Sequence, residues 1–529
     1  MHRLYRRIYL EVHMQTEKEY LTGREIVALR CESVGEYSLP DYNTDVKKVL
    51  TVKTKVFPSG KFASDDSLEF SGSVGYEVVY LDTDDNVTHA EFSTDYDAAV
   101  RINAQSYVDS DVVTTVAGCN MRLVGPRKLS VKCSLDNNVR ICERRVYEVE
   151  GDAFVGYEPE MLTKMVNVLT PAFSSCEAKE YTEQILSIDG AIADEVEILL
   201  NDASFVLDSL ERSDDEVKIK GRIRVTLLYK NGDLSPMTVT KEFPVDEDMD
   251  IGDAMSLSDL DARVEITSLK SKVEPTEDGV SLVVTFTAAP KLLAIGNSNV
   301  EVILDAYLKE RMTENEHSDF VYTEHLCMER GEDAFNAKIP LSELGIENAG
   351  DVIWQEALAR VESCEIMENR VKIMGEIRFS AIACQVSEEN RPMCFPIKLT
   401  VPFEQNVNHN CQIHENMRAN CTVNVSDVKI EFDENNISVS SDLLAFVNIS
   451  SDRRQRCLGA SYVTDEEFAR DDSVVTVYYP DASESLFSIA KRFHTSLSSI
   501  AEANKLTESV FASSSEPLSA AGVGKLIIK

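Results

Sequence analysis

The sequence predicts a mainly β protein with three tandem β-rich, sandwich-like repeats of about 150 residues and a small βααβ domain at the C-terminus. Three observations support this prediction. A strand pattern with period-two alternation occurs three times among the 529 residues, and turn-forming residues separate the alternating runs. Near the C-terminus the apolar spacing changes from that of strands to that of helices.

The repeated strand pattern has one glycine at a fixed register among alternating apolar residues. It occurs in residues 68–80, 217–229 and 371–384, where the glycines are Gly72, Gly221 and Gly375. These glycines are spaced almost equally along the chain. Alternation of this kind predicts half-buried strands, and a glycine at one register predicts a bulge or a close backbone approach.

Three further landmarks keep similar offsets from these glycines. An aspartate followed by apolar residues lies upstream of each, at Asp45, Asp194 and Asp351. A phenylalanine lies downstream of each, at Phe92, Phe243 and Phe403. Alternating runs start further downstream, at Leu129, Val280 and Ile437. A single alternating run is common in any β-rich chain, but the joint spacing favours a triplication.

A period of about 150 residues exceeds the roughly 20 to 50 residues that are typical of a solenoid unit. We therefore expect independent domains joined in a row, with short linkers and an extended surface that offers several docking sites. The expected boundaries are an N-terminal extension over residues 1–25, repeats over 26–150, 151–325 and 326–465, and a C-terminal domain over 472–529.

Two short amphipathic helices are expected in the C-terminal domain. Leu486, Ile489, Ala490 and Phe493 form one apolar helical face, with Ser483 in the position of an N-cap. A second helix follows the break at 494–496 and carries Leu497, Ile500 and Ala501 on its inner face. Apolar strands at 474–479 and 525–528 flank the helices and complete a βααβ unit.

The charge of the chain argues against two classes of partner. Lys and Arg number 53 and Asp and Glu number 91, which gives a formal net charge of −38. A nucleic-acid binder or a protein that docks on an anionic membrane needs clustered cations, so we expect neither. No apolar run approaches the ~18 residues of a transmembrane helix, and Glu11 and His13 interrupt the only stretch that resembles a signal peptide.

The twelve cysteines are scattered without a Cys-x-x-Cys pair, which favours free thiols in a reducing compartment. The densest group with metal-ligand chemistry is His409, Cys411 and His414, with Cys394 and Cys421 nearby in the sequence. Its spacing fits no common zinc site, so we expect no metal. Residues 82–86 and 246–250 resemble parts of calcium loops but lack the required glycine and glutamate, so solvated turns are the better interpretation.

No sequence signature of an active site is present. A nucleophile elbow, a phosphate-binding loop, a dinucleotide fingerprint and a His-Glu-x-x-His motif are all missing, so we expect no catalytic residues and no cofactor. Paired carboxylates for glycoside cleavage stay open, because their spacing is spatial. The single tryptophan, Trp354, is expected in the core.

Residues 483–506 and 524–529 resemble the LysM domains, a family with a βααβ fold whose glycan-binding members recognise N-acetylglucosamine polymers such as peptidoglycan. Ser483, Glu484 and Ser485 stand where the family usually has Gly-Asp-Thr, and Phe487 stands where Trp is frequent. The loop between Asn504 and Gly524 is longer than usual and contains Val510 and Phe511. The resemblance implies that these residues contact a partner, either glycan or protein, and the departures favour a protein. The candidate contacts are Ser483, Glu484, Ser485, Phe487, Asn504, Val510, Phe511 and Gly524.

Residues 38–50, with Leu39-Pro40-Asp41 and the apolar residues after Asp45, resemble an element of the SPOCS domains. These domains occur in spore-coat morphogenetic proteins, often several in a row before a LysM domain. The resemblance implies a cytoplasmic, mother-cell scaffold, peripheral at the forespore surface or spore coat, that contacts the ATPase of the coat's basement layer. The alternatives are a peptidoglycan-binding protein of the cell wall or spore cortex, a wall hydrolase with a LysM tail, and a phage tail protein.

Overall fold

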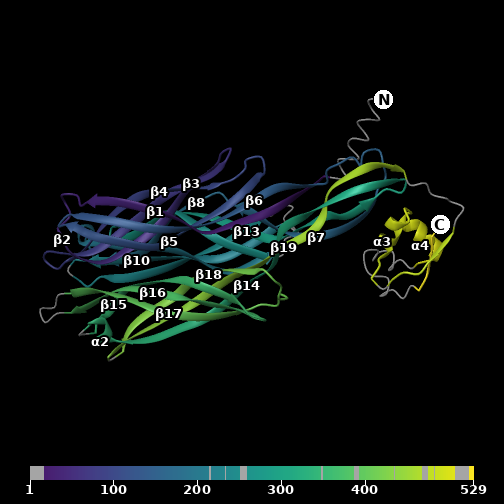
Figure 1. Ribbon diagram of the computed structural model, residues 1–529. Helices are drawn as coiled ribbons and strands as arrows, with labels where there is room; N and C mark the ends of the chain where they lie inside the picture. The colour runs from purple at the N-terminus through teal and green to yellow at the C-terminus, as the bar shows by residue number, and fades with distance from the viewer. Residues whose placement is uncertain are drawn as a thin grey trace.

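The computed structural model is almost entirely antiparallel β-sheet, so the prediction of a mainly β fold is confirmed (Figure 1). It describes residues 17–213, 216–232, 234–250, 259–346, 349–386, 392–433, 435–467, 475–481, 483–506 and 524–528. A body of long strands tapers into an arm, and a small domain with two helices lies at the end of this arm (Figure 1).

The first six strands form two three-stranded sheets. Strand β1 (Glu17–Ser38) pairs with β6 (Lys128–Glu148), which also pairs with β5 (Tyr107–Gly125). The second sheet is a meander of β2 (Val46–Ala63), β3 (Ser67–Asp82) and β4 (Val87–Arg101). Apolar side chains of β3 and β6 pack between the two sheets, as in a sandwich. We call this six-strand arrangement unit 1.

The next strands repeat this order as unit 2. The meander consists of β9 (Val196–Arg212), β10 (Glu216–Asn231) and β11 (Met237–Asp250), and η1 (Ala193–Glu195) precedes it. The facing sheet has β13 (Gly279–Tyr307) at its centre, between β12 (Asp259–Pro275) and β7 (Glu160–Ser175). Unit 2 differs from unit 1 in one respect: two strands take the place of β1. Strand β7 pairs with the C-terminal half of β13, and β8 (Lys179–Asp189) pairs with its N-terminal half.

Unit 3 has the same order again. Strands β15 (Asp351–Ile366), β16 (Arg370–Val386) and β17 (Pro392–Asn408) form its meander. The facing sheet is β14 (Arg311–Pro340), β19 (Asn436–Glu467) and β18 (Met417–Asp433), and the short helix α2 (Leu341–Leu344) links the two sheets. The repeated glycines and the alternating runs downstream of them fall on equivalent strands in all three units.

The predicted bulge at the repeated glycine is confirmed. Each of these glycines lies on the central strand of its meander, and the pairing register shifts at or opposite to it. A side chain there would collide with the neighbouring strand, since an added Cβ would lie 2.5 Å from the carbonyl oxygen of Phe57 at Gly72 and 2.5 Å from that of Val206 at Gly221. At Gly375 it would overlap the carbonyl oxygen of Arg360. The glycine is thus required by close backbone approach.

The units are not joined in a row as separate domains, which corrects the expectation from the repeat length. A single apolar cluster, here called the shared core, contains residues from all three meanders. Leu50, Leu199 and Trp354, each just inside the first strand of its meander, meet in this core. The aspartate landmarks therefore precede the residues that join the units. Trp354 is buried, as predicted.

A buried ion-pair cluster also connects the three units. Lys53 Nζ in unit 1 lies 3.0 Å from Asp202 Oδ2 in unit 2 and 2.9 Å from Glu356 Oε2 in unit 3. Burial lowers the pKa of Lys53, but the two carboxylates outweigh this effect and raise it above its usual range. Such a cluster fixes the relative placement of the three units.

The domain boundaries remain predictions. Two of them fall inside strands of the structure. The boundary between residues 25 and 26 falls within β1, and the boundary between 325 and 326 falls within β14. Strand β14 belongs with the sheet of unit 3 along its whole length, because it pairs with β19 from Arg311 to Pro340. No described helix is long and apolar enough to cross a membrane.

Candidate functional site

The C-terminal domain consists of β20 (Thr476–Tyr478), α3 (Leu486–Arg492), α4 (Leu497–Asn504) and β21 (Leu526–Ile528), with β20 and β21 paired. Leu486, Ile489 and Ala490 of α3 pack with Ile500 of α4 and with the apolar residues of β21. The N-cap of α3 is Ser485 and not Ser483 as predicted. The Ser485 hydroxyl accepts from Ser488 N, and the Ser488 hydroxyl accepts from Ser485 N, which completes a capping box.

Glu484, near the start of this domain, is bound by residues of the domain itself. Glu484 accepts hydrogen bonds from Tyr478 Oη at 2.7 Å and Asp481 N at 3.0 Å, and it forms an ion pair with Arg492 at 2.6 Å. The bond from Tyr478, together with the other two, lowers the pKa of Glu484. Ser483 is exposed and Gly524 has open space around it, so both are accessible to a partner.

Two predicted contact residues have structural roles. Phe487 is only 2% exposed and lies edge-on to Tyr307, with 5.3 Å between ring centroids, so its ring offers no surface to a ligand. The side-chain amide of Asn504 donates to the carbonyls of Ile500 and Ile527, and its oxygen accepts from Ile527 N at 2.6 Å. Asn504 therefore ties α4 to β21. The remaining two predicted contacts, Val510 and Phe511, lie outside the described residues.

The end of strand β13 supports the domain through contacts that the sequence does not predict. Tyr307 is 1% exposed, joins the apolar core of the small domain, and donates to the carbonyl of Thr495 at 2.7 Å. Lys491 forms an ion pair with Asp305 at 2.6 Å, and His494 Nδ1 lies 2.9 Å from the carbonyl oxygen of Leu308. No periodicity connects the end of β13 with the segment from Lys491 to Thr495, so no sequence signal could have found this joint.

The arm behind this joint has an apolar core of its own. Tyr147, Val166, Val302, Phe320 and Leu458 contribute to it from five different strands. Tyr147 Oη donates to the carbonyl of Leu458 at 2.9 Å, which connects unit 1 to unit 3 within the arm. The small domain thus packs on the arm. The arm covers the face of the domain that the C-terminal end of α3 and the following turn form.

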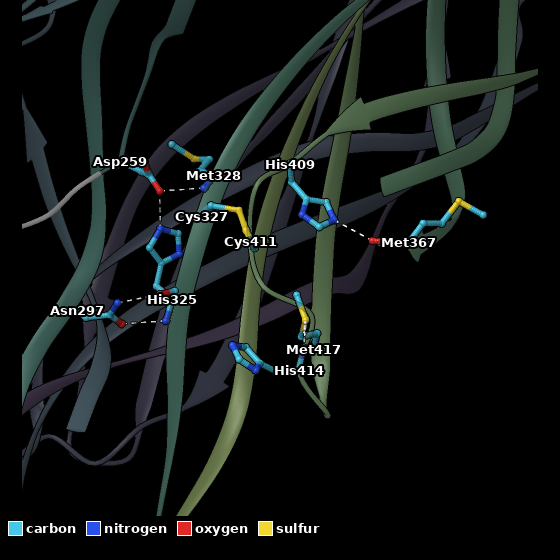
Figure 2. The surroundings of a disulfide bond; sticks show 10 residues. All are labelled: Asp259, Asn297, His325, Cys327, Met328, Met367, His409, Cys411, His414 and Met417. Atoms are coloured by element: carbon cyan, nitrogen blue, oxygen red, sulfur yellow. Dashed lines mark hydrogen bonds and ion pairs between the residues drawn. A yellow bond between two sulfur atoms is a disulfide. The ribbon is translucent and has the colours of Figure 1, made fainter. Parts of the chain in front are cut away.

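The candidate metal ligands do not assemble into a site. Cys411 forms a disulfide with Cys327, and His409 Nε2 lies 3.0 Å from the carbonyl oxygen of Met367 (Figure 2). His414 lies apart from both, beside Met417 (Figure 2). In the part of the chain that the structure describes, no three His, Cys, Asp or Glu side chains converge as metal ligands would.

The expectation of free thiols is wrong for four cysteines. Cys384 and Cys394 form a second disulfide, because the pairing of β16 with β17 places them directly opposite each other. Strand order, which scattered spacing in the sequence does not show, brings the partners of both bonds together.

The two segments that resemble calcium loops are parts of the β-sheet structure. Asp82 is buried and accepts from the backbone N–H groups of Asp84 and Asn86, which closes the turn between β3 and β4. Residues 246–250 belong to strand β11, where Asp246 pairs with Lys218 at 2.9 Å.

The comparisons with known proteins identify one part of the chain. The model of the LysM domain family matches residues 482–510, which include the capped helix α3 and all of α4. No curated protein and no solved structure matches the chain. The small domain is therefore a LysM domain, and this supports a role in binding peptidoglycan or another N-acetylglucosamine polymer, or a role at the cell wall.

Proposed function

We propose that this protein is a non-catalytic adaptor in spore-coat assembly, in which the three-unit body makes protein contacts and the LysM domain is the recognition module. The observation that carries the proposal is the joint between Tyr307 and the LysM domain. A domain that is seated on a packed arm is presented at a fixed distance from the body, which suits a bridge between two layers. Several weak contacts along one chain can then give high avidity.

The SPOCS-like element of residues 38–50 supports the spore-coat assignment. In this assignment the partner is the ATPase of the coat's basement layer, and the protein works on the mother-cell side, peripheral to the forespore. The strongly acidic surface, with a net charge of −38, favours partners with basic patches. Purified full-length protein should therefore capture this ATPase, and capture should weaken as salt rises.

Capture from sporulating cells tests the assignment. Recovery of the ATPase with the wild-type chain, and its loss at high salt, would support the adaptor. Production of the protein only in vegetative cells would contradict it. Muramidase or peptidase activity of the purified chain in a zymogram would contradict the non-catalytic assignment.

Peptidoglycan binding by the LysM domain is the second candidate, and the family match favours it. Ser483 and Gly524 lie at accessible positions of the domain, while the face near Lys491 and His494 is covered by the arm. Sedimentation of the full-length protein with purified peptidoglycan separates the two candidates. Binding at low micromolar concentration or below, without capture of the ATPase, would favour the second candidate.

A further inference from the structure

Four free cysteines form two close pairs, in addition to the two disulfides. Cys119 on β5 and Cys133 on β6 belong to unit 1, and Cys364 on β15 and Cys421 on β18 belong to unit 3. In each pair a hydrogen bond joins the two thiols. Most of the twelve cysteines, although scattered in the sequence, are therefore paired in space.

The pair in unit 1 has the strand geometry of a disulfide that the structure already contains. Cys119 and Cys133 lie directly opposite each other in the antiparallel pairing of β5 with β6. Cys384 and Cys394, which form a disulfide, have the same relation in the pairing of β16 with β17. Residues that are directly opposite on antiparallel strands have Cβ atoms about 4.5–5.5 Å apart, close to the roughly 3.5–4.5 Å of a disulfide. A bond between Cys119 and Cys133 therefore needs no rearrangement of the sheet.

The pair in unit 3 connects the two sheets of its sandwich. Cys364 lies on an outer strand of the meander, and Cys421 lies on an outer strand of the facing sheet. Both side chains pack against the apolar core of unit 3. The two strands are in direct contact, because Ile430 N donates to Gln355 Oε1 at 2.8 Å. A bond between Cys364 and Cys421 would join the sheets along one edge.

Exposure and thiol chemistry allow both pairs to react. Cys119 is exposed and can meet a dissolved oxidant, whereas Cys133 is buried behind it. The hydrogen bond with Cys119 lowers the pKa of Cys133, which favours the thiolate that attacks a disulfide. In unit 3 both thiols are half-buried, and the hydrogen bond with Cys421 lowers the pKa of Cys364 in the same way.

We propose that Cys119 with Cys133, and Cys364 with Cys421, are dithiol sites that a small-molecule disulfide such as oxidised glutathione converts to protein disulfides. In unit 1 the Cys119 thiolate attacks oxidised glutathione, forms a mixed disulfide and releases one glutathione thiolate. The Cys133 thiolate then attacks the Cys119 sulfur and displaces the second glutathione thiolate. The two cysteines lose two electrons and two protons, and one oxidised glutathione becomes two reduced molecules. Oxidation would thus raise the number of cross-links in the body from two to four.

Peptide mapping of the native full-length protein tests the proposal. The protein is incubated with oxidised glutathione at neutral pH, the remaining thiols are alkylated, and the chain is digested with trypsin without reductant. Cleavage after Arg122 and Lys128 separates the partners in unit 1, and cleavage after Arg370 and Arg418 separates those in unit 3. Mass spectrometry should then find both linked peptide pairs, and dithiothreitol should release them.

Three outcomes of the mapping would overturn the proposal. In the first, Cys119 carries glutathione while Cys133 is still alkylated. In the second, Cys133 is linked to another cysteine of unit 1, such as Cys31, whose sulfur accepts from the side-chain amide of Asn137 at 3.3 Å. In the third, one pair stays reduced while the other is oxidised, which would overturn the proposal for the pair that stays reduced.

Two variants and one matched control distinguish the pairs from general thiol reactivity. Cys119→Ser should leave Cys133 as a free thiol, while the bond in unit 3 forms as in the wild-type protein. Cys176→Ser is the control, because Cys176 is half-buried like Cys364 and is the single cysteine of unit 2, and both bonds should form in it. Oxidation should lower the unfolding equilibrium constant of the wild-type protein by about tenfold more than that of Cys364→Ser. Equal changes in the two proteins would overturn the cross-link between the sheets.

Discussion

The shared core and the LysM joint are held by different kinds of contact. In the shared core, side chains from three meanders bury a continuous apolar cluster, and elsewhere between the units a buried lysine pairs with carboxylates from two other units. At the joint, the described contacts include the ring of Tyr307 against Phe487, the ion pair between Lys491 and Asp305, and bonds to the carbonyls of Thr495 and Leu308. The core residues follow repeated landmarks, whereas the joint residues occur once. Repetition thus marks what unites the body, and the attachment of the recognition module is specific to one place.

The largest effect should come from the shared core. Trp354→Ala should lower the free energy of unfolding of the body by about 3 kcal/mol or more, because it leaves a cavity where three units meet. Denaturant unfolding followed by circular dichroism measures this change. The control is Leu358→Ala on the same strand, where the side chain is 45% exposed and the loss should be below about 1 kcal/mol. Similar losses in the two variants would show that the shared core does not unite the units.

The repeated glycine should come next. Gly375→Ala should destabilise the body by about 2 kcal/mol, since the added methyl group overlaps the carbonyl oxygen of Arg360 and the ring of Phe403. Gly60→Ala is the control, because nothing lies within 4 Å of an added Cβ there. Fluorescence of Trp354, the only tryptophan, reports unfolding of the body in both variants. A Gly375→Ala protein as stable as the wild type would contradict the requirement for close backbone approach.

Acid should loosen the contact between units 1 and 2. Glu197 bonds to His89 at 2.7 Å and pairs with Lys230 at 2.6 Å. Burial raises the pKa of Glu197, but the hydrogen bonds from His89 and Lys230 and the charge of Lys230 outweigh it and hold the pKa at about 2. Because the folded-state pKa is depressed, the stabilisation is present above about pH 4.5 and is lost as pH falls toward 2. The loss should be about 2 kcal/mol after allowance for partial exposure.

Unfolding measured between pH 6 and pH 2.5 tests this linkage. Glu197→Gln should be less stable than the wild-type protein at neutral pH, and the difference between the two should shrink on acidification. A difference that stays constant over this range would show that the pKa of Glu197 is the same in the folded and unfolded states.

The smallest effect should be local to the joint. Tyr307→Phe removes the hydroxyl that donates to Thr495, which should cost about 1 kcal/mol. Amide hydrogen exchange in residues 486–504 should accelerate by about fivefold. The unfolding midpoint reported by Trp354 should hardly move, since Tyr307 packs with the LysM core and not with the shared core. A matching shift of that midpoint would mean that body and LysM domain unfold as one unit.

The fold was accessible from the sequence because alternation and glycine register are local signals. They predicted a strand around each glycine of the repeat, and helical spacing predicted the apolar face of α3. The packing of the three units against one another could not be predicted from the sequence. Alternation shows that one face of a strand is buried, but it does not show which unit covers the opposite face. The sequence predicts Ser483 as the N-cap although Ser485 has that role, because both are serines and only the reciprocal bond with Ser488 distinguishes them.

The candidate site was predicted only in part for the same reason. The βααβ order and the family were visible in the sequence, but the burial of Phe487 depends on Tyr307, which lies on a strand of unit 2 far earlier in the chain. The two thiol pairs combine cysteines from different strands, and no sequence spacing connects them.

The central claim, that the accessible edge of the seated LysM domain is the recognition surface, is tested most directly by one binding comparison. Full-length Ser483→Arg and Ser498→Arg each place the same bulky cation at an exposed serine of this domain, the first at the predicted contact edge and the second on α4. Their binding to the basement-layer ATPase and to purified peptidoglycan is measured beside that of the wild-type protein. We expect Ser483→Arg to lose about tenfold in affinity for the true partner and Ser498→Arg to bind like the wild type. Unchanged binding of Ser483→Arg to both partners would contradict the claim.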